Sequence, residues 1–228
     1  MPRQMRDPAF RKAQHDQLHE PHIAPITAYV EQLRADSGRW LPYVAPLHGG
    51  INARLLTVLR DPGPKVHEVG GSGMLCVEND DQTAESKYSL MQQAGLAPSD
   101  FTPWNAYPWY INSAPTPAQI AEAAPTLVGL INLMPDLQAV LLHGIHAADA
   151  WRVALSSQSA LRARRLEVFE TYHPSNQALR TNVPGERERR KQHRIDTWIE
   201  AGDWLRAADS ARQGAPAVRG PGHTVAHG

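Results

Sequence analysis

The stretch LLTVLRDPGP, residues 55–64, places a short apolar run directly before a rigid turn. Residues 55–59 are aliphatic or β-branched, a composition typical of a buried strand. Pro62, Gly63 and Pro64 follow at once, and proline and glycine favour a turn over a continued strand. The stretch therefore predicts a strand that ends near Leu59, with Asp61 standing just beyond its carboxyl end.

Short runs of the same kind recur along the chain and alternate with helical segments. We predict further strands at residues 74–77, 101–105, 139–142 and 166–171. Helices are predicted around the apolar stripe of residues 26–33, over residues 80–94 and 186–208, and from residues 116 and 147 onward. This alternation is typical of parallel sheets covered by helices on both faces. The sequence thus predicts an α/β fold, a three-layer α/β/α sandwich around a mostly parallel, roughly four-stranded sheet.

The length of 228 residues, with 42% hydrophobic and 20% charged residues, favours a single soluble domain. We expect an irregular leader over residues 1–22, the α/β domain over 23–208 and a disordered tail over 209–228. Cys76 is the only cysteine, which excludes an intramolecular disulfide and a cysteine-built metal cluster. No apolar run approaches the roughly 20 residues of a membrane span, and no signal-type region opens the chain, so we expect a cytoplasmic protein with no membrane partner.

The charges of the chain balance overall but not locally. Lys and Arg total 23, and so do Asp and Glu. The net charge of the whole chain therefore gives no information about a polyanionic partner. Between residues 162 and 194, however, nine Arg or Lys residues accompany four Glu residues. This local excess fits either a solvated helix face or a surface that contacts phosphate groups.

Polar residues follow three of the predicted strands directly. Asp61 follows the first strand, Asn105 ends the segment of residues 101–105, and His173 follows the last strand. In parallel sheets, ligands bind beyond the carboxyl ends of the strands. We therefore expect these three side chains to share one site.

The same segments resemble motifs of the uracil-DNA glycosylase superfamily. Residues 59–63 (LRDPG) are similar to its water-activating loop, Asn105-Ala106 to its base-reading segment, and His173-Pro174-Ser175 to its His-Pro-Ser loop. The resemblance spans about residues 55–180 and implies a DNA glycosylase that acts as a monomer without cofactor or metal. Such an enzyme flips a uracil-like or modified pyrimidine out of DNA and hydrolyses its N-glycosidic bond, leaving an abasic site.

The resemblance also implies a role for each residue. Asp61 would orient a water and offset the positive charge that develops on the sugar. His173, as a neutral imidazole, would donate a hydrogen bond to O2 of the pyrimidine, and Asn105 would read its O4 and N3–H. No lysine lies within the three motifs, so we expect hydrolysis alone and no Schiff-base lyase step.

The sequence departs from the family pattern around the base. Gly63 stands where the main family has a Tyr that closes the pocket against the 5-position of the base, so this side is expected to be open. The stacking aromatic is missing, and Met74 or Cys76 would act as a polarizable platform in its place. Glu78 is a further candidate, for contact with an amino or hydroxyl group of the base.

The expected DNA contacts lie near the last motif. The family's apolar wedge, which fills the gap left by the flipped base, is replaced by Asn176-Gln177. Ser175 and the basic cluster that includes Arg187 and Arg190 are expected to contact phosphates.

Three other interpretations stay open at this point. An open 5-position would suit a glycosylase for bulky 5-modified cytosines in phage DNA, a role in antiviral defence rather than in DNA repair. A DNA-binding relative that has lost catalysis is disfavoured, because Asp61, Asn105 and His173 are all retained. A metal site at His143, His146 and Asp149 is disfavoured by Gly144, which would point the two imidazoles apart.

Overall fold

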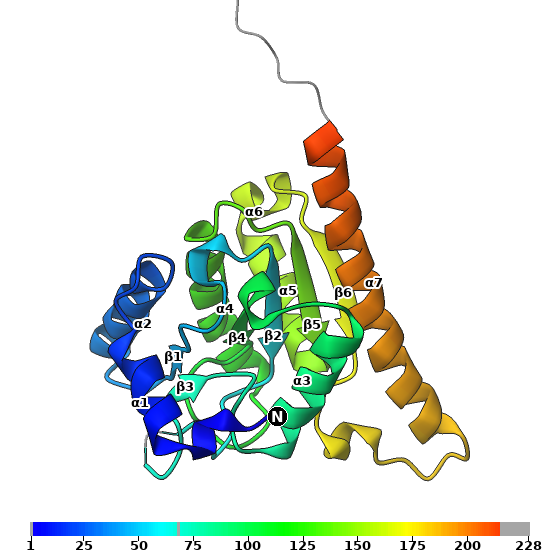
Figure 1. Ribbon diagram of the computed structural model, residues 1–228, viewed down its shortest axis with the longest axis horizontal. Helices are drawn as coiled ribbons and strands as arrows, with labels where there is room; N and C mark the ends of the chain where they lie inside the picture. The colour runs from blue at the N-terminus through cyan, green and yellow to red at the C-terminus, as the bar shows by residue number, and fades with distance from the viewer. Residues whose placement is uncertain (1, 68, 215–228) are drawn as a thin grey trace, which may run out of the picture.

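The computed structural model describes residues 2–67 and 69–214 and has a central parallel sheet covered by helices (Figure 1). The described helices are α1 (Pro8–Asp16), α2 (Ala24–Ser37), α3 (Gln82–Gln93), α4 (Pro117–Asn132), α5 (Ile145–Ser157), α6 (Ser159–Ala163) and α7 (Glu186–Gly214). The described strands are β1 (Tyr43–Val44), β2 (Leu55–Leu59), β3 (Met74–Leu75), β4 (Phe101–Asn105), β5 (Ala139–His143) and β6 (Glu167–Thr171).

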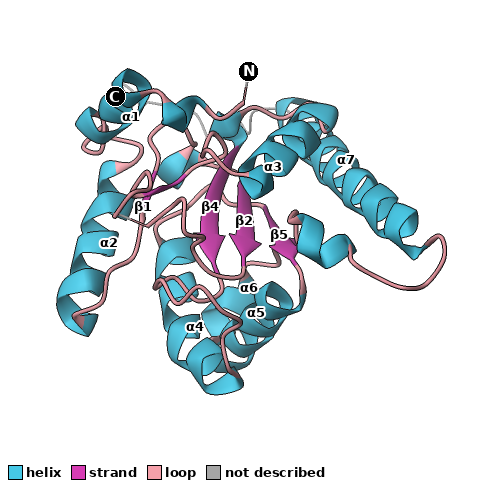
Figure 2. Ribbon diagram, turned by 90° about the horizontal axis from the view of Figure 1, so that it is seen from below, coloured by secondary structure: helices cyan, strands magenta, loops and turns pink. Residues whose placement is uncertain are grey.

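The central sheet has the strand order β4-β2-β5-β6, and all of its strands are parallel. Their carboxyl ends therefore meet at one edge, where Leu59 pairs with Asn105 and His143 with Thr171. Figure 2 shows the strands between α3 and α7 on one side and α4 and α5 on the other. The predicted three-layer sandwich around a four-stranded parallel sheet is confirmed.

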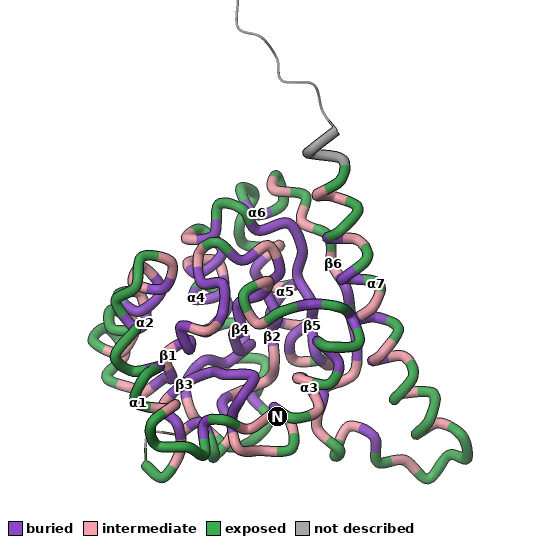
Figure 3. Tube along the Cα trace, in the orientation of Figure 1, coloured by how far each residue is buried: buried purple, intermediate pink, exposed green. Residues whose placement is uncertain are grey.

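Alternate residues of the strands enter two apolar layers. In β2, Leu56 and Val58 pack on the side of α4 and α5, whereas Leu55 packs on the side of α3 and α7. A parallel strand that is buried on both faces reads as a continuous apolar run. Figure 3 shows much of the central sheet as buried, whereas α2 and α7 carry many exposed positions. The edge strand β6 is an exception within the sheet, because its Glu167 and Glu170 are exposed.

An aspartate N-cap fixes the start of α3. The side chain of Asp81 accepts a hydrogen bond from the backbone N–H of Ala84 at 2.9 Å. Gly95, with φ +67°, follows the helix and takes a backbone conformation that favours glycine. These two positions determine where α3 begins and ends, and hence which of its side chains face the sheet.

The N-terminal segment is not the irregular leader that we expected. It contains α1, which begins after Asp7, whose side chain accepts a hydrogen bond from the N–H of Ala9 at 2.9 Å. Met5 and Leu18, on either side of α1, are buried in a small apolar cluster with Cys76. The N-terminal segment packs on the domain because Met5 and Leu18 bury their apolar side chains against Met74 and Cys76.

The C-terminal tail begins later than the expected residue 209. Helix α7 continues past residue 209 to Gly214, and the remainder of the predicted disordered tail, residues 215–228, lies outside the described residues. Within the described part of the chain, no helix combines the length and apolar character needed to cross a membrane.

Candidate active site

A pocket of about 230 Å³ lies at the carboxyl edge of the sheet, next to the start of α3. Asp61, Asn105 and His173 all line it, so the structure brings the three predicted residues together from three different strand ends. The other lining residues are Leu59, Pro62, Gly63, Pro64, Lys65, Val66, Leu75, Cys76, Asn79, Asp81, Gln82, Thr83, Ala84, Lys87, Pro103 and Trp104.

Gly63 forms part of the pocket wall and leaves space beside it. A Cβ atom at this position would meet no atom within 4 Å. The wall is therefore open where a larger side chain would narrow the pocket.

Asp61 is held in place by its neighbour Arg60. The carboxylate accepts a hydrogen bond from Arg60 Nε, and only 3% of the Asp61 side chain is exposed. Burial raises the pKa of Asp61 above its ordinary value, although the hydrogen bond from Arg60 acts in the opposite direction. Asp61 is thus a desolvated carboxylate, which accepts a proton more readily than an exposed one does.

The hydrogen bonds of His173 determine its tautomer. Nδ1 lies 3.2 Å from the backbone nitrogen of Ser175, which can only donate, so Nδ1 must be the acceptor. Ser175 Oγ, at 3.0 Å, can donate to the same atom. Burial lowers the pKa of His173 to about 4, and nearby Arg60 adds to this effect. His173 is therefore a neutral imidazole that carries its proton on Nε2 and can donate it to a ligand.

Two asparagine side chains complete the polar lining. Asn105 is buried, and its Nδ2 has no hydrogen-bond partner among the described residues. Asn79 Nδ2 donates to the carbonyl oxygen of Met74 at 2.9 Å, whereas its buried Oδ1 lacks a partner within the same described part of the chain. Two residues that line the pocket thus each carry a buried amide atom without a partner among the described residues, a donor on Asn105 and an acceptor on Asn79. Asn79 was not predicted from the sequence, because an asparagine just before a helix is ordinarily a turn residue.

Lys87 also lines the pocket and was missed. It is 4% exposed, and its Nζ donates a hydrogen bond to Thr57 Oγ1 at 2.7 Å. A signal for its burial exists in the helical spacing, since Ala84, Lys87 and Leu90 recur every three residues and are all buried on one face of α3.

Two of the predicted base contacts do not line the pocket. Met74 packs into the apolar cluster around Met5 and Leu18, because β3 turns its side chain toward the N-terminal segment. Glu78 faces the same segment, and its carboxylate accepts hydrogen bonds from the backbone N–H and the side-chain amide of Gln4. Cys76 does line the pocket, and burial raises the pKa of its thiol, which stays neutral.

The His-Pro-Ser loop is held from behind by α7. Arg194 is buried and donates to the carbonyl oxygens of Pro174 at 3.2 Å and Ser175 at 2.7 Å. Its guanidinium is therefore committed to the loop and is not available to phosphates, a role that sequence reasoning missed.

The predicted DNA-contacting residues near this loop differ in their exposure and in whether other side chains already bind them. Asn176, Gln177 and Arg187 are exposed. Arg190 instead donates to Glu186 and to the carbonyl oxygen of Ala178. Ser175 is part of the hydrogen bonding to His173 described above.

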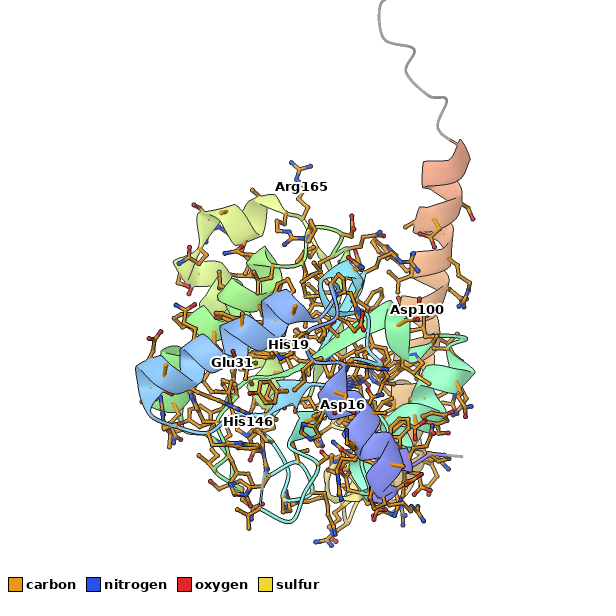
Figure 4. All side chains as sticks on the ribbon, turned by 60° about the vertical axis from the view of Figure 1, so that its left-hand side comes forward. Asp16, His19, Glu31, Asp100, His146 and Arg165 are labelled. Carbon is orange, nitrogen blue, oxygen red and sulfur yellow. The ribbon has the colours of Figure 1, made fainter. Side chains whose placement is uncertain are left out.

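The alternative metal site does not assemble. His143 is buried and stacks against Trp198 of α7, with ring centroids 5.7 Å apart. His146, by contrast, lines a separate pocket with Asp149 at the start of α5. In Figure 4, His146 lies toward the bottom and Arg165, which precedes β6, at the top, so His146 belongs to the carboxyl end of the sheet. The turn at Gly144 separates the two imidazoles, as its position in the sequence suggested.

Comparison with protein families adds one finding. The family model described as the uracil DNA glycosylase superfamily matches residues 47–201, a range that includes Asp61, Asn105 and His173. A search of the curated proteins gave no match.

Proposed function

Since the chain belongs to the uracil DNA glycosylase superfamily, whose members act on DNA, we propose that it is a monofunctional DNA glycosylase. Its substrate is a uracil-like or modified pyrimidine that has been flipped out of DNA, and its product is an abasic site. The observation that carries this proposal is the shared pocket of Asp61, Asn105 and His173. Three side chains with different chemistry meet there at the ends of three strands.

The chemistry of base removal suits these three groups. When the N-glycosidic bond breaks, its electron pair stays with the base, and the sugar becomes positively charged. Asp61 would stabilise this charge and take up a proton from the attacking water, a task that its raised pKa favours. His173 would donate Nε2–H to the base oxygen on which negative charge accumulates, and Asn105 would bind the polar edge of the base.

The open wall at Gly63 supports a substrate that is larger than uracil. A substituent at the 5-position would have space beside Gly63, where even an added Cβ atom would have no neighbour within 4 Å. This favours thymine-like bases or bulky 5-modified cytosines as further candidates, the second of which would point to defence against phage DNA.

DNA binding requires contacts outside the pocket. Extruding a base from the duplex costs a few kcal/mol, which phosphate contacts must supply. We propose Ser175, Asn176, Gln177, Arg187 and Arg190 for this surface, with the exposed Arg187 as the principal cation, because Arg190 is already paired with Glu186.

The test is a panel of duplexes and single strands that carry uracil, mismatched thymine, hypoxanthine or 5-modified cytosines, each heated in alkali to reveal abasic sites. The wild-type protein should release at least one of these bases. Asp61→Asn should slow release by about 100-fold or more, because general-base and electrostatic assistance are lost, while DNA retention stays largely intact.

Asp16→Asn is the matched control, since Asp16 is an exposed carboxylate on α1. It should leave the rate unchanged. Absence of base release from every substrate would contradict the proposed function, and an unchanged rate in Asp61→Asn would contradict the role of Asp61.

A further inference from the structure

Lys87 is a buried amine that forms no ion pair with the described residues. It reaches from α3 to the middle of β2, where Thr57 Oγ1 accepts its hydrogen bond at 2.7 Å. The Phe101 ring lies on another side, with its centroid 4.7 Å from Nζ. Asp61 and Asp81 are the carboxylates that line the pocket, and within the described residues neither forms an ion pair with Lys87: Asp61 pairs with Arg60, and Asp81 caps α3.

The titratable groups that interact with Lys87 from other elements are all neutral. These groups are His48, Cys76, His143 and His173. Burial lowers the pKa of His48 to about 3 and the pKa of His143 well below its ordinary value, and it raises the pKa of the Cys76 thiol. Over the ranges that the structure describes, no neighbouring anion therefore compensates a positive charge on Lys87.

A buried ammonium group is costly unless an anion or a set of acceptors satisfies it. Burial accordingly lowers the pKa of Lys87 to about 7, so that the amine is partly protonated near neutral pH. A ligand that carries negative charge into the pocket would restore full protonation. The reaction proposed above creates such a ligand, because the departing base leaves with the electron pair of the glycosidic bond.

We propose that Lys87 binds the departing base and stabilises its negative charge, as a second catalytic group beside the neutral imidazole of His173. This inference rests on the proposed function. Lys87 Nζ donates a hydrogen bond to an oxygen of the base, and this bond strengthens as the N-glycosidic bond breaks and the base becomes anionic. No covalent bond to Lys87 is formed.

The test compares wild type, Lys87→Met and Lys87→Gln in single-turnover base release from a uracil-containing duplex between pH 6 and pH 9. Methionine has the length of the lysine side chain without its amino group and carries no charge, and glutamine keeps a donor without a charge. Lys12→Met, on an exposed lysine of α1, is the matched control.

We expect Lys87→Met to slow release at pH 6 by tenfold or more. The wild-type rate should fall as the pH rises above neutrality and Lys87 loses its proton, and both Lys87 variants should lack this fall. Their thermal unfolding temperature should be equal to or higher than that of wild type, because a buried unpaired charge has been removed.

Each other outcome overturns the inference. An unchanged rate in Lys87→Met, or an equal loss at every pH with the alkaline fall retained, would show that Lys87 is only structural. In both cases the glycosylase proposal would stand, because the wild type releases base. If the wild type releases no base from any duplex, the glycosylase proposal fails, and the role of Lys87 fails with it.

Discussion

Position 63 lines the pocket, on the side proposed above to face the 5-position of the base. Gly63 does not have a positive φ, and a Cβ atom there meets nothing within 4 Å, so a larger residue needs no backbone change. We expect Gly63→Tyr to fold normally and to close the open wall. Release of uracil should persist, whereas release of 5-substituted pyrimidines should fall by about tenfold or more, as expected for a steric clash in a pocket.

Parallel single-turnover assays on the two kinds of duplex measure this change in preference. Gly63→Ala is the control, because its single methyl group leaves most of the space free. An equal loss on both kinds of substrate in Gly63→Tyr would contradict a role of this position in specificity.

Single residues also show where sequence reasoning succeeded and where it did not. Asp61, Asn105 and His173 could be predicted to share a site, because each stands at a strand end and parallel strands end together. Lys87 could not, because a lysine within a helix is ordinarily exposed, and only the three-residue spacing to its buried neighbours indicates otherwise. Glu78 was predicted to contact the base because it lies close to the pocket residues in the sequence. Its side chain instead points away from the pocket and accepts hydrogen bonds from Gln4.

At the scale of elements, α7 supports the loop that carries His173. Arg194 holds two carbonyl oxygens of this loop, at Pro174 and Ser175. Arg194→Met should leave these acceptors without their donor and lower the free energy of unfolding by about 1–3 kcal/mol. Base release should slow as well, because the Nε2–H of His173 is less firmly directed.

Urea unfolding and single-turnover assays test this prediction. Arg187→Met is the control for urea unfolding alone, because Arg187 is also proposed to contact DNA. An exposed position of this kind changes stability by about 0.5 kcal/mol or less. If Arg194→Met and Arg187→Met were equally stable, the bracing role of Arg194 would be wrong.

The bounds of an element could be predicted where a single local sequence feature determines them. Strands β2 and β4 have the bounds predicted, and a proline, Pro62 or Pro108, follows closely after the end of each. Helix α1 was missed, although Asp7-Pro8 is a typical start signal with a cap and a proline at the first helical position. Its polar sequence shows little periodicity, and what holds it is the contact of its flanks with β1 and β3, which lie far along the chain.

On the scale of the whole molecule, burial shifts the pKa values of several groups so that their uncharged form is favoured. His48 and His173 have pKa values lowered to about 3 and about 4, and burial lowers the pKa of Lys87 to about 7. These groups come from the loop before β2, the loop after β6 and helix α3. His173 and Lys87 line the pocket, whereas His48 packs against Pro98 and Phe101 at the start of β4. The buried groups that make stability depend on pH therefore include the site and extend beyond it.

Acid should destabilise the protein through its histidines. The unfolded chain binds protons at these residues near pH 6.5, whereas the native pKa values of His48 and His173 are lower. As the pH falls below about 6.5, the unfolded state takes up protons that the native state cannot, and stability is lost progressively toward pH 4. Urea unfolding at fixed ionic strength should show this fall.

Lys87 should make stability rise with pH above neutrality. The unfolded amine has a pKa of 10.5 and the native amine about 7, so between these values the unfolded state binds the additional proton. The free energy of unfolding should therefore increase from pH 7 toward pH 10, by on the order of 1.4 kcal/mol for each unit of the pKa difference. Lys87→Met should be more stable than wild type at pH 7 and should lack this increase. Parallel stability curves for the two proteins over this range would mean that Lys87 is paired in solution, contrary to its surroundings in the structure.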